Sequence, residues 1–187
     1  MPVFLLGLCV MFLSCASREA ASQEVTAPVI EVSQAELDAF NLTRYTDKEY
    51  IPLENLVTPA GLPFDPRELR GKYVFLNFWT TWCPYCAQEK PSIQQLYQES
   101  DTFTVLTVSL GEKAGTVQEY METNGYSFPV LVNASNSLRE AWAPRIPATY
   151  ILDTDGSIIA RINGNKDWTS GQAVQILEFV VQGLQGR

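Results

Sequence analysis

The chain of 187 residues contains no histidine. This absence excludes Ser-His-Asp and Cys-His catalytic pairs, imidazole metal sites and histidine-ligated haem. Positive charge is also scarce, because 13 Lys and Arg residues stand against 21 Asp and Glu residues and leave a formal charge of -8. A protein that follows nucleic-acid phosphates needs a basic surface, so we expect no nucleic-acid partner. The remaining chemistry is that of thiols, carboxylates, amines and phenols.

The apolar segment at the N-terminus is short. Residues 3–13 read VFLLGLCVMFL, which is eleven apolar residues or glycines, whereas a membrane-spanning helix needs about 20. The length and position of this segment are typical of the hydrophobic region of a secretory signal peptide. We therefore expect residues 1–14 to be a signal peptide that exports the chain to a bacterial cell envelope.

A cysteine at the end of this segment indicates a lipid anchor. Ser14-Cys15 resembles the bacterial lipobox, in which a small residue precedes a cysteine that is diacylated and becomes the new amino terminus, although Phe12 stands where leucine is usual. Lipidation of Cys15 would anchor the chain to a membrane, facing the periplasm or the exterior. The alternative is an ordinary cleavable signal in which Cys15 has no role.

Composition divides the rest of the chain into two parts. Residues 15–47 are rich in Ala, Ser, Gln, Glu and Thr and lack a sustained apolar period, so we expect a tether. Ser33 and Glu36 have the spacing of a capping box, which predicts one short helix within it. Residues 48–187 alternate between strand and helix patterns, and we expect them to form one domain with a hydrophobic core.

The pattern of the domain predicts an α/β fold. Residues 73–79 form a near-continuous apolar run, which is typical of a strand buried on both faces. Residues 153–156 read DTDG between two apolar runs and indicate a hairpin. A parallel strand pair extended by antiparallel strands should then give a central mixed sheet flanked by helices. The other expected elements are helices at 84–99, 114–124, 136–142 and 170–184, and strands at 103–109, 148–152 and 157–162.

Two of the four cysteines lie in the domain, in the sequence Cys83-Pro84-Tyr85-Cys86. At the start of a helix this spacing places both sulfurs on one face, close enough to bond, as a redox dithiol requires. The helix N-terminus offers unpaired N–H groups and the positive end of the helix dipole, which would stabilise a Cys83 thiolate. Pro84 suits the first helical position, where no N–H is needed.

Three other uses of this cysteine pair are weaker. A structural disulfide with so short a loop would remove little chain entropy. Zinc would need two further ligands, and the sequence has no histidine and no other cysteine in the domain. Covalent haem attachment needs histidine after the second cysteine, and residue 87 is alanine. We therefore expect a redox pair, no metal and no separate cofactor.

The surrounding residues resemble a known family. The segment 71–86, GKYVFLNFWTTWCPYC, followed by Glu89 and Pro91, is similar to the TlpA/ResA/CcmG group of membrane-tethered thioredoxin-like proteins. The segment 146–156, IPATYILDTDG, resembles the second landmark of that family. The resemblance covers about residues 50–187, and it implies a thioredoxin-like fold and thiol:disulfide exchange through a Cys83–Cys86 disulfide.

The resemblance also assigns proton transfer. Cytosolic thioredoxins have a buried Asp six residues before the first cysteine, and this chain has Asn77 there. The acid is instead Glu89, one helical turn beyond Cys86, which could take the proton of that resolving thiol. The alternative for Glu89 is a solvated helix carboxylate without a role in the reaction.

Three residues are expected at the substrate. By the resemblance, Pro147 is a cis-proline after Ile146 that faces the dithiol and exposes backbone to an extended substrate segment. From sequence alone it would be an ordinary loop proline, because few X–Pro bonds are cis. Trp82, directly before Cys83, is the aromatic residue expected to touch substrate, whereas Trp79 is expected in the core.

The resemblance implies an extracytoplasmic dithiol reductase of exported proteins, and the clients of the family include apocytochrome c. Reducing equivalents must then come from a transmembrane electron donor, and we expect a monomer. The Pro-Tyr pair between the cysteines is more familiar from glutaredoxins, which leaves the direction of exchange open. One alternative is a thiol peroxidase, since Thr80 matches a peroxiredoxin position, although Leu76 stands where a proline is expected. Another alternative is a non-catalytic thioredoxin-like binding module.

Overall fold

The apolar run at 73–79 forms the central strand of the protein. The computed structural model describes residues 30–185, and in it β2 (Tyr73–Trp79) lies between β3 (Phe103–Leu110) and β5 (Ala148–Leu152). β2 pairs with β3 in parallel and with β5 antiparallel. The parallel pair extended by antiparallel strands is therefore confirmed. The signal segment and Cys15 lie outside the described residues.

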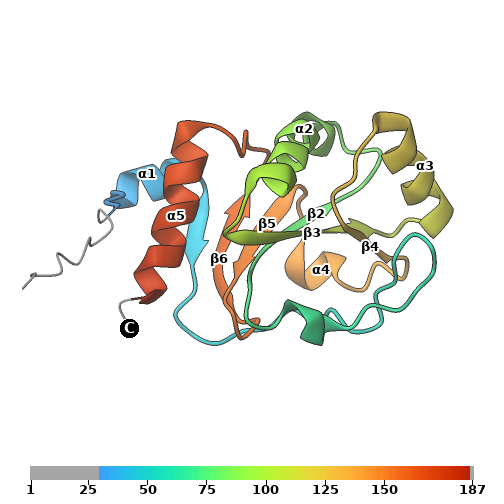
Figure 1. The fold of residues 1–187 in the computed structure, drawn as a ribbon, viewed down its shortest axis with the longest axis horizontal. Coiled ribbons are helices and arrows are strands. Elements are labelled where there is room, and N and C mark those ends of the chain that lie inside the picture. The colour runs from blue at the N-terminus through green and yellow to red at the C-terminus, as the bar shows by residue number, and fades with distance from the viewer. Residues whose placement is uncertain (1–29, 186–187) are drawn as a thin grey trace, which may run out of the picture.

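The other strands and helices complete a layered α/β structure (Figure 1). The remaining elements are α1 (Gln34–Ala39), β1 (Leu42–Arg44), a short 3-10 helix (Pro66–Leu69), α2 (Pro84–Glu99), α3 (Ala114–Asn124), β4 (Val130–Asn133), α4 (Arg139–Trp142), β6 (Ile158–Asn163) and α5 (Gly171–Gln185). The strands form one sheet in the order β1-β6-β5-β2-β3-β4. Figure 1 shows α2 and α4 on opposite sides of this sheet, so the predicted mixed sheet flanked by helices is confirmed.

Side chains of β2 alternate between two hydrophobic cores. Phe75 and Trp79 belong to the cluster that includes residues of α1, α2, α3 and α5, whereas Leu76 and Phe78 belong to the cluster beneath α4 and the 51–69 segment. Because successive side chains of a strand point to opposite faces, Asn77 shares the face of Phe75 and Trp79. This places a buried amide directly under α2.

The helices that border the site have the expected bounds. α2 begins at Pro84 and ends at Glu99, and α3 covers 114–124. Gly125 ends α3 with φ 68°, a left-handed conformation that glycine adopts without steric cost. The predicted hairpin is formed by β5 and β6, which pair antiparallel around residues 153–156.

The boundary between tether and domain differs from the expectation at residue 47. β1 pairs antiparallel with β6 at the edge of the sheet, and Leu37, Phe40 and Leu42 are buried in the core. α1 does begin with the predicted capping box between Ser33 and Glu36. Residues 33–44 thus belong to the folded domain, because their three apolar side chains pack into the core and β1 extends the sheet.

Two further elements differ from the predicted pattern. The edge strand β4 was not expected, because its four residues follow a helix without a clear alternation. The helix expected at 136–142 begins only at Arg139, because Asn136 has φ 58° and the Asn133 side chain accepts the N–H of Leu138. These side-chain and backbone bonds of a turn compete with the first helical turn.

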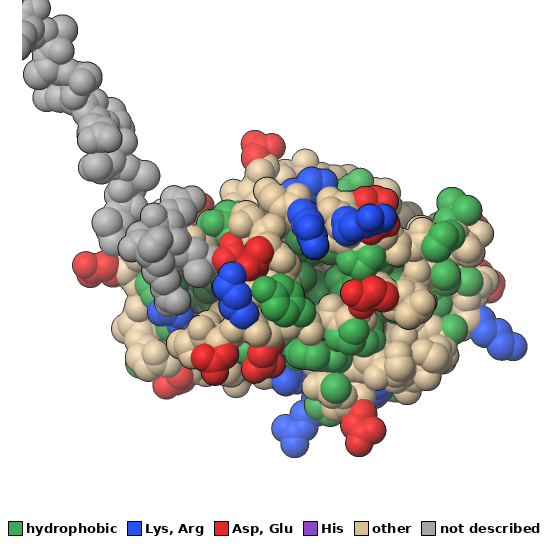
Figure 2. All heavy atoms as spheres, turned by 90° about the horizontal axis from the view of Figure 1, so that it is seen from below, with side chains coloured by type: hydrophobic (Ala, Val, Ile, Leu, Met, Phe, Trp, Pro, Cys, Tyr) green, Lys and Arg blue, Asp and Glu red, His purple; other side chains and the backbone are tan. Residues whose placement is uncertain are grey.

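The surface on the α4 side is mixed in character. Figure 2, a view from below Figure 1, shows Lys and Arg side chains among Asp and Glu side chains, with hydrophobic groups between them. Within residues 30–185, no helix is long and apolar enough to cross a membrane. That same part of the chain holds no cluster of three Cys, Asp or Glu residues placed to bind a metal ion.

Candidate functional site: a dithiol at the start of a helix

The two cysteines of the domain are bonded to each other at the N-terminus of α2. Cys83 is the N-cap residue, its Sγ accepts the Cys86 N–H at 3.1 Å, and the Cα atoms are 5.2 Å apart. Pro84 occupies the first helical turn, where its missing N–H leaves no hydrogen bond unmade. Cys83 is 5% exposed and Cys86 is fully buried. Cys83 is therefore the more exposed of the two sulfurs.

The register of the sheet brings the proline loop to the same end of the molecule. Phe78 of β2 pairs with Ala148 of β5, so residues 146–147 lie beside the loop that leads from β2 to Cys83. The Ile146–Pro147 peptide bond is cis. Ile146 is partly buried and Pro147 is buried. The fold thus places the proline loop next to the dithiol.

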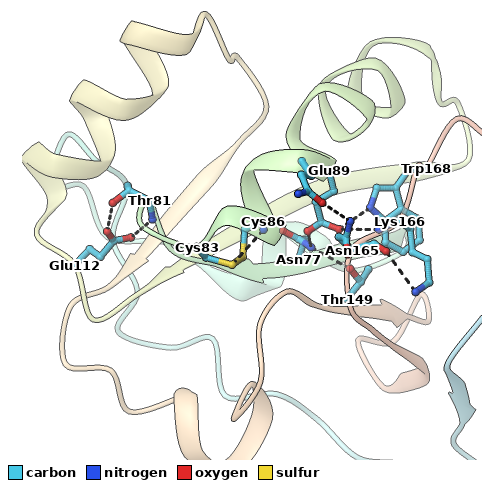
Figure 3. The surroundings of a disulfide bond; sticks show 11 residues. Asn77, Thr81, Cys83, Cys86, Glu89, Glu112, Thr149, Asn165, Lys166 and Trp168 are labelled. Atoms are coloured by element: carbon cyan, nitrogen blue, oxygen red, sulfur yellow. Dashed lines mark hydrogen bonds between the residues drawn. A yellow bond between two sulfur atoms is a disulfide. The ribbon is translucent and has the colours of Figure 1, made fainter.

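Glu89 lies inside the protein, so the alternative of a solvated helix carboxylate is wrong. Its side chain is fully buried and accepts N–H bonds from Asn77 Nδ2 at 2.8 Å, Trp168 Nε1 at 3.2 Å and the backbone of Lys166 at 3.4 Å (Figure 3). Burial raises the pKa of Glu89, while the charge of Lys90 and the bonds from Asn77 and Trp168 oppose that rise. A raised pKa suits a carboxylate that accepts a proton near neutral pH.

Asn77 links this carboxylate to the proline loop. Its Nδ2 donates both to Glu89 and, at 3.0 Å, to the hydroxyl of Thr149. Thr149 lies in β5, two residues after Pro147. Asn77 Oδ1 is buried and has no hydrogen-bond partner. The amide thus joins β2, α2 and β5 beneath the dithiol.

A second carboxylate, Glu112, holds the other side of the site. It follows β3 and accepts hydrogen bonds from the Thr81 N–H at 2.9 Å, from the Thr81 hydroxyl and from the Ser109 hydroxyl at 2.6 Å. Figure 3 shows the Thr81–Glu112 pair on one side of the disulfide and the Glu89 group on the other. Glu112 fixes the loop that carries Cys83, and no sequence motif had indicated it.

Lys90 is another buried residue that sequence motifs did not indicate. Cys86, Glu89, Lys90 and Ile93 are the buried residues of α2, and their spacing of i, i+3, i+4 and i+7 is that of one helical face. A helical period anchored on Cys86 and Ile93 would have predicted burial for both charged residues. Helical periodicity is therefore the sequence signal that could have predicted the burial of Lys90.

Two exposed aromatic residues flank Cys83 in the sequence. Trp82 and Tyr85 are 64% and 62% exposed, whereas Trp79 is fully buried. The guanidinium of Arg139 in α4 lies 5.6 Å from the centre of the Trp82 ring. Large exposed aromatic rings are common anchors at binding surfaces. Trp82 thus presents an exposed aromatic ring directly before Cys83, and the core position expected for Trp79 is confirmed.

The sequence is similar to that of a known family and of named proteins. Residues 49–161 match the model of the AhpC/TSA family. The chain belongs to the AhpC/TSA family. The chain is 34% identical over 121 residues to the thiol-disulfide oxidoreductase ResA of Halalkalibacterium halodurans, covering 63% of this chain and 65% of that protein. It is 31% identical to ResA of Bacillus subtilis, covering 56% and 60%.

Solved structures give the fold. StoA from Bacillus subtilis has a TM-score of 0.55 at 27% identity and covers 70% of this chain and 98% of that chain. A thioredoxin-family thiol:disulfide interchange protein from Chlorobium tepidum has a TM-score of 0.56 at 27% identity, covering 74% and 99%. The thioredoxin-like fold and the resemblance to ResA are therefore confirmed. The matched region spans less than two thirds of the length of the ResA proteins.

Proposed function

We propose that this AhpC/TSA family member is a thiol:disulfide oxidoreductase that reduces disulfides of exported proteins. The observation that carries the proposal is the Cys83–Cys86 disulfide at the N-terminus of α2, with Cys83 as the more exposed sulfur. Its similarity to ResA proteins supports the same chemistry. The proposed site consists of Cys83, Cys86 and Glu89 for the reaction, with a substrate surface made by Trp82 and the proline loop.

The proposed reaction transfers two electrons and two protons. The Cys83 thiolate attacks a client disulfide, a mixed disulfide forms, and the first client sulfur leaves as a thiolate that takes up a proton. Cys86 then gives its proton to Glu89 and attacks the Cys83 sulfur. The second client thiolate leaves and is protonated, and the Cys83–Cys86 disulfide remains. A dithiol on a transmembrane donor returns the pair to its reduced form.

The proposed setting comes from the N-terminal sequence. We place the protein in a bacterial cell envelope, held to a membrane by lipid on Cys15, and acting as a monomer. Replacing Cys15 with Ser should release the protein from membranes and abolish lipid labelling. Apocytochrome c is the first client to test, because the family resemblance implies it.

An insulin-reduction assay tests the activity. Reduced wild-type protein should accelerate insulin reduction by dithiothreitol, and the Cys83→Ser variant should lose the acceleration entirely. A binding module predicts no acceleration by either protein, which would refute the proposal. A thiol peroxidase predicts rapid peroxide consumption by the reduced protein with little insulin reduction. Negligible peroxide consumption is expected here, because Leu76 occupies the position where that chemistry calls for a proline and is buried in the sheet.

A further inference from the structure

Lys90 is an amine buried in the interior next to the proposed proton acceptor. The side chain is fully buried, and its Nζ has no hydrogen-bond partner. Taking an ammonium out of water is costly unless neighbouring groups compensate its charge. A lysine at this place therefore needs a physical explanation, which the proposed reaction alone does not give.

Aromatic rings supply part of that compensation. Lys90 Nζ lies 3.8 Å from the centre of the Trp79 ring and 5.6 Å from that of Phe128. An ammonium above the face of a tryptophan is attracted by the ring quadrupole, most strongly when both are shielded from water. The rings come from the end of β2 and the segment before β4, so they hold the amine in the core beside α2.

The ionisable groups around Lys90 are mostly acidic. Glu89 precedes it in α2, and Glu112 after β3 acts on its charge as well. Tyr120 of α3 lies 5.3 Å from the Trp79 ring, and burial raises its pKa, so it stays neutral near pH 7. Lys166, between β6 and α5, is a partly buried cation: burial lowers its pKa, and the charge of Glu89 opposes that fall. Lys90 is therefore the fully buried cation among two carboxylates.

The hydrogen bonds of Glu89 favour its ionised form, whereas its burial favours the protonated form. All three of its hydrogen-bond partners are N–H donors, which an ionised carboxylate accepts best. Complete burial works in the opposite direction and favours the protonated acid. A positive charge held nearby in the same low-dielectric interior can decide between the two forms, because charges interact strongly there.

We propose that Lys90 is a positioning residue for proton transfer, whose buried positive charge keeps Glu89 ionised so that it can accept the Cys86 proton. This inference rests on the proposed thiol:disulfide reaction and deepens it. Cys86 loses its proton to the Glu89 carboxylate as its sulfur attacks Cys83, and the resulting acid later releases that proton to water. Lys90 neither gains nor loses a proton in the cycle, and it acts through Glu89 alone.

The test replaces Lys90 with methionine, which has a similar length and no charge. Lys72→Met is the matched control, because it makes the same change in net charge at an exposed residue just before β2. The resolution step is measured in a single turnover, from a mixed disulfide between Cys83 and a peptide, between pH 5 and 9. The pKa of Glu89 is followed by carboxyl ¹³C NMR in the same proteins.

For Lys90→Met we expect a higher pKa of Glu89 and a resolution rate about tenfold lower at pH 6, recovered at higher pH. Lys72→Met should overlay the wild type. If Lys90 served only to pack against Trp79, the variant would lose rate equally at every pH and the pKa of Glu89 would not move, and that result would overturn the proposal.

A measurement on the unaltered protein covers the case of a variant that fails to fold. Lysine labelled with ¹³C at Cε reports whether Lys90 is charged while Glu89 titrates. A charged Lys90 across that titration supports the proposal, and a neutral Lys90 overturns it. Failure of the proposed function is distinct, because wild-type protein would then reduce no insulin, whereas failure of this inference leaves wild-type reduction intact.

Discussion

The two carboxylates beside the dithiol are held in different ways. Glu112 accepts one backbone N–H and two hydroxyl hydrogens, so it ties a loop to a strand end by neutral donors. Glu89 accepts three N–H bonds, is completely buried and is followed by Lys90, whose amine has no hydrogen-bond partner. One side of the dithiol is thus built for fixed geometry, and the other holds buried charges that can respond to a proton.

The two carboxylates therefore differ in what they contribute: Glu112 fixes the loop that carries Cys83, whereas Glu89 is placed among buried charges that respond to protonation. Hydrogen bonds from neutral donors stabilise a loop without changing its charge. A carboxylate buried beside an ammonium is sensitive to any nearby change of charge, including a thiol that becomes a thiolate. Substitutions on the two sides should therefore affect different properties of the protein.

The largest effect is expected from Glu89→Gln. The amide keeps the shape of the side chain and cannot accept a proton, so disulfide reduction at pH 7 should fall by about a hundredfold or more. The unfolding transition should remain cooperative. Steady-state insulin reduction measures the effect, with Glu99→Gln at the exposed end of α2 as the control. Equal rates for Glu89→Gln and Glu99→Gln would remove Glu89 from the reaction.

A second substitution on the Glu89 side, at Lys90, should raise the stability of the protein. Burial lowers the pKa of Lys90 to about 7 from its ordinary value of 10.5, so the amine carries the charge that the proton-transfer role requires below pH 7 and loses it above. Between these values the unfolded chain binds more protons than the native one, so the contribution of Lys90 to stability rises with pH through that window. Once Lys90 is gone, Glu89 can take up a proton at pH 6, so Lys90→Met removes the cost of burying the ammonium without leaving a bare carboxylate. It should raise the free energy of unfolding at pH 6 by about 1 kcal/mol.

The pH dependence of the free energy of unfolding tests the stability gain expected for Lys90→Met. The pKa of Glu89 is raised, so its own contribution to stability falls as the pH rises above its ordinary value of 4.5, opposite in direction to that of Lys90. Urea denaturation of wild type and Lys90→Met should therefore differ most at pH 6 and least near pH 10. A variant less stable than wild type at pH 6 would mean that the contact with Trp79 outweighs the burial cost.

A smaller effect is expected on the other side of the dithiol. Glu112→Ala leaves the Thr81 N–H and the Ser109 hydroxyl without their acceptor, which should lower the free energy of unfolding by about 1–3 kcal/mol. Insulin reduction should fall only severalfold, with a pH dependence closer to that of wild type than to that of Lys90→Met, because Glu112 acts on Lys90 less than Glu89 does. Glu119→Ala at an exposed position of α3 is the control. A pH dependence in Glu112→Ala like that of Lys90→Met would erase the distinction between the two carboxylates.

The sequence was sufficient for the elements that strong local patterns define. The apolar run of β2, the Pro84 start of α2 and the glycine end of α3 each have a local physical cause, and all three lie where expected. The Cys-x-x-Cys spacing likewise placed the two sulfurs within bonding distance. Local signals of this kind do not depend on what the rest of the chain does.

The remaining features depend on contacts between distant segments. β1 exists because β6 offers it a free edge, and Glu112 meets Thr81 only because β3 lies beside β2. The burial of Lys90 could have been read from the spacing of Cys86 and Ile93, but a charged residue on an apolar face is usually assigned to solvent. Contacts between distant segments, rather than local propensity, determine whether these elements form and whether these side chains are buried.

Trapping of mixed disulfides tests the role of the dithiol most directly. The Cys86→Ser and Cys83→Ser variants are incubated with a peptide disulfide, and the products are identified by mass spectrometry. Because Cys83 is the more exposed of the two sulfurs and lies at the helix N-terminus, Cys86→Ser should accumulate peptide bound to Cys83, and Cys83→Ser should accumulate none. Peptide trapped on Cys86, or on neither cysteine, would contradict attack by Cys83 and resolution by Cys86.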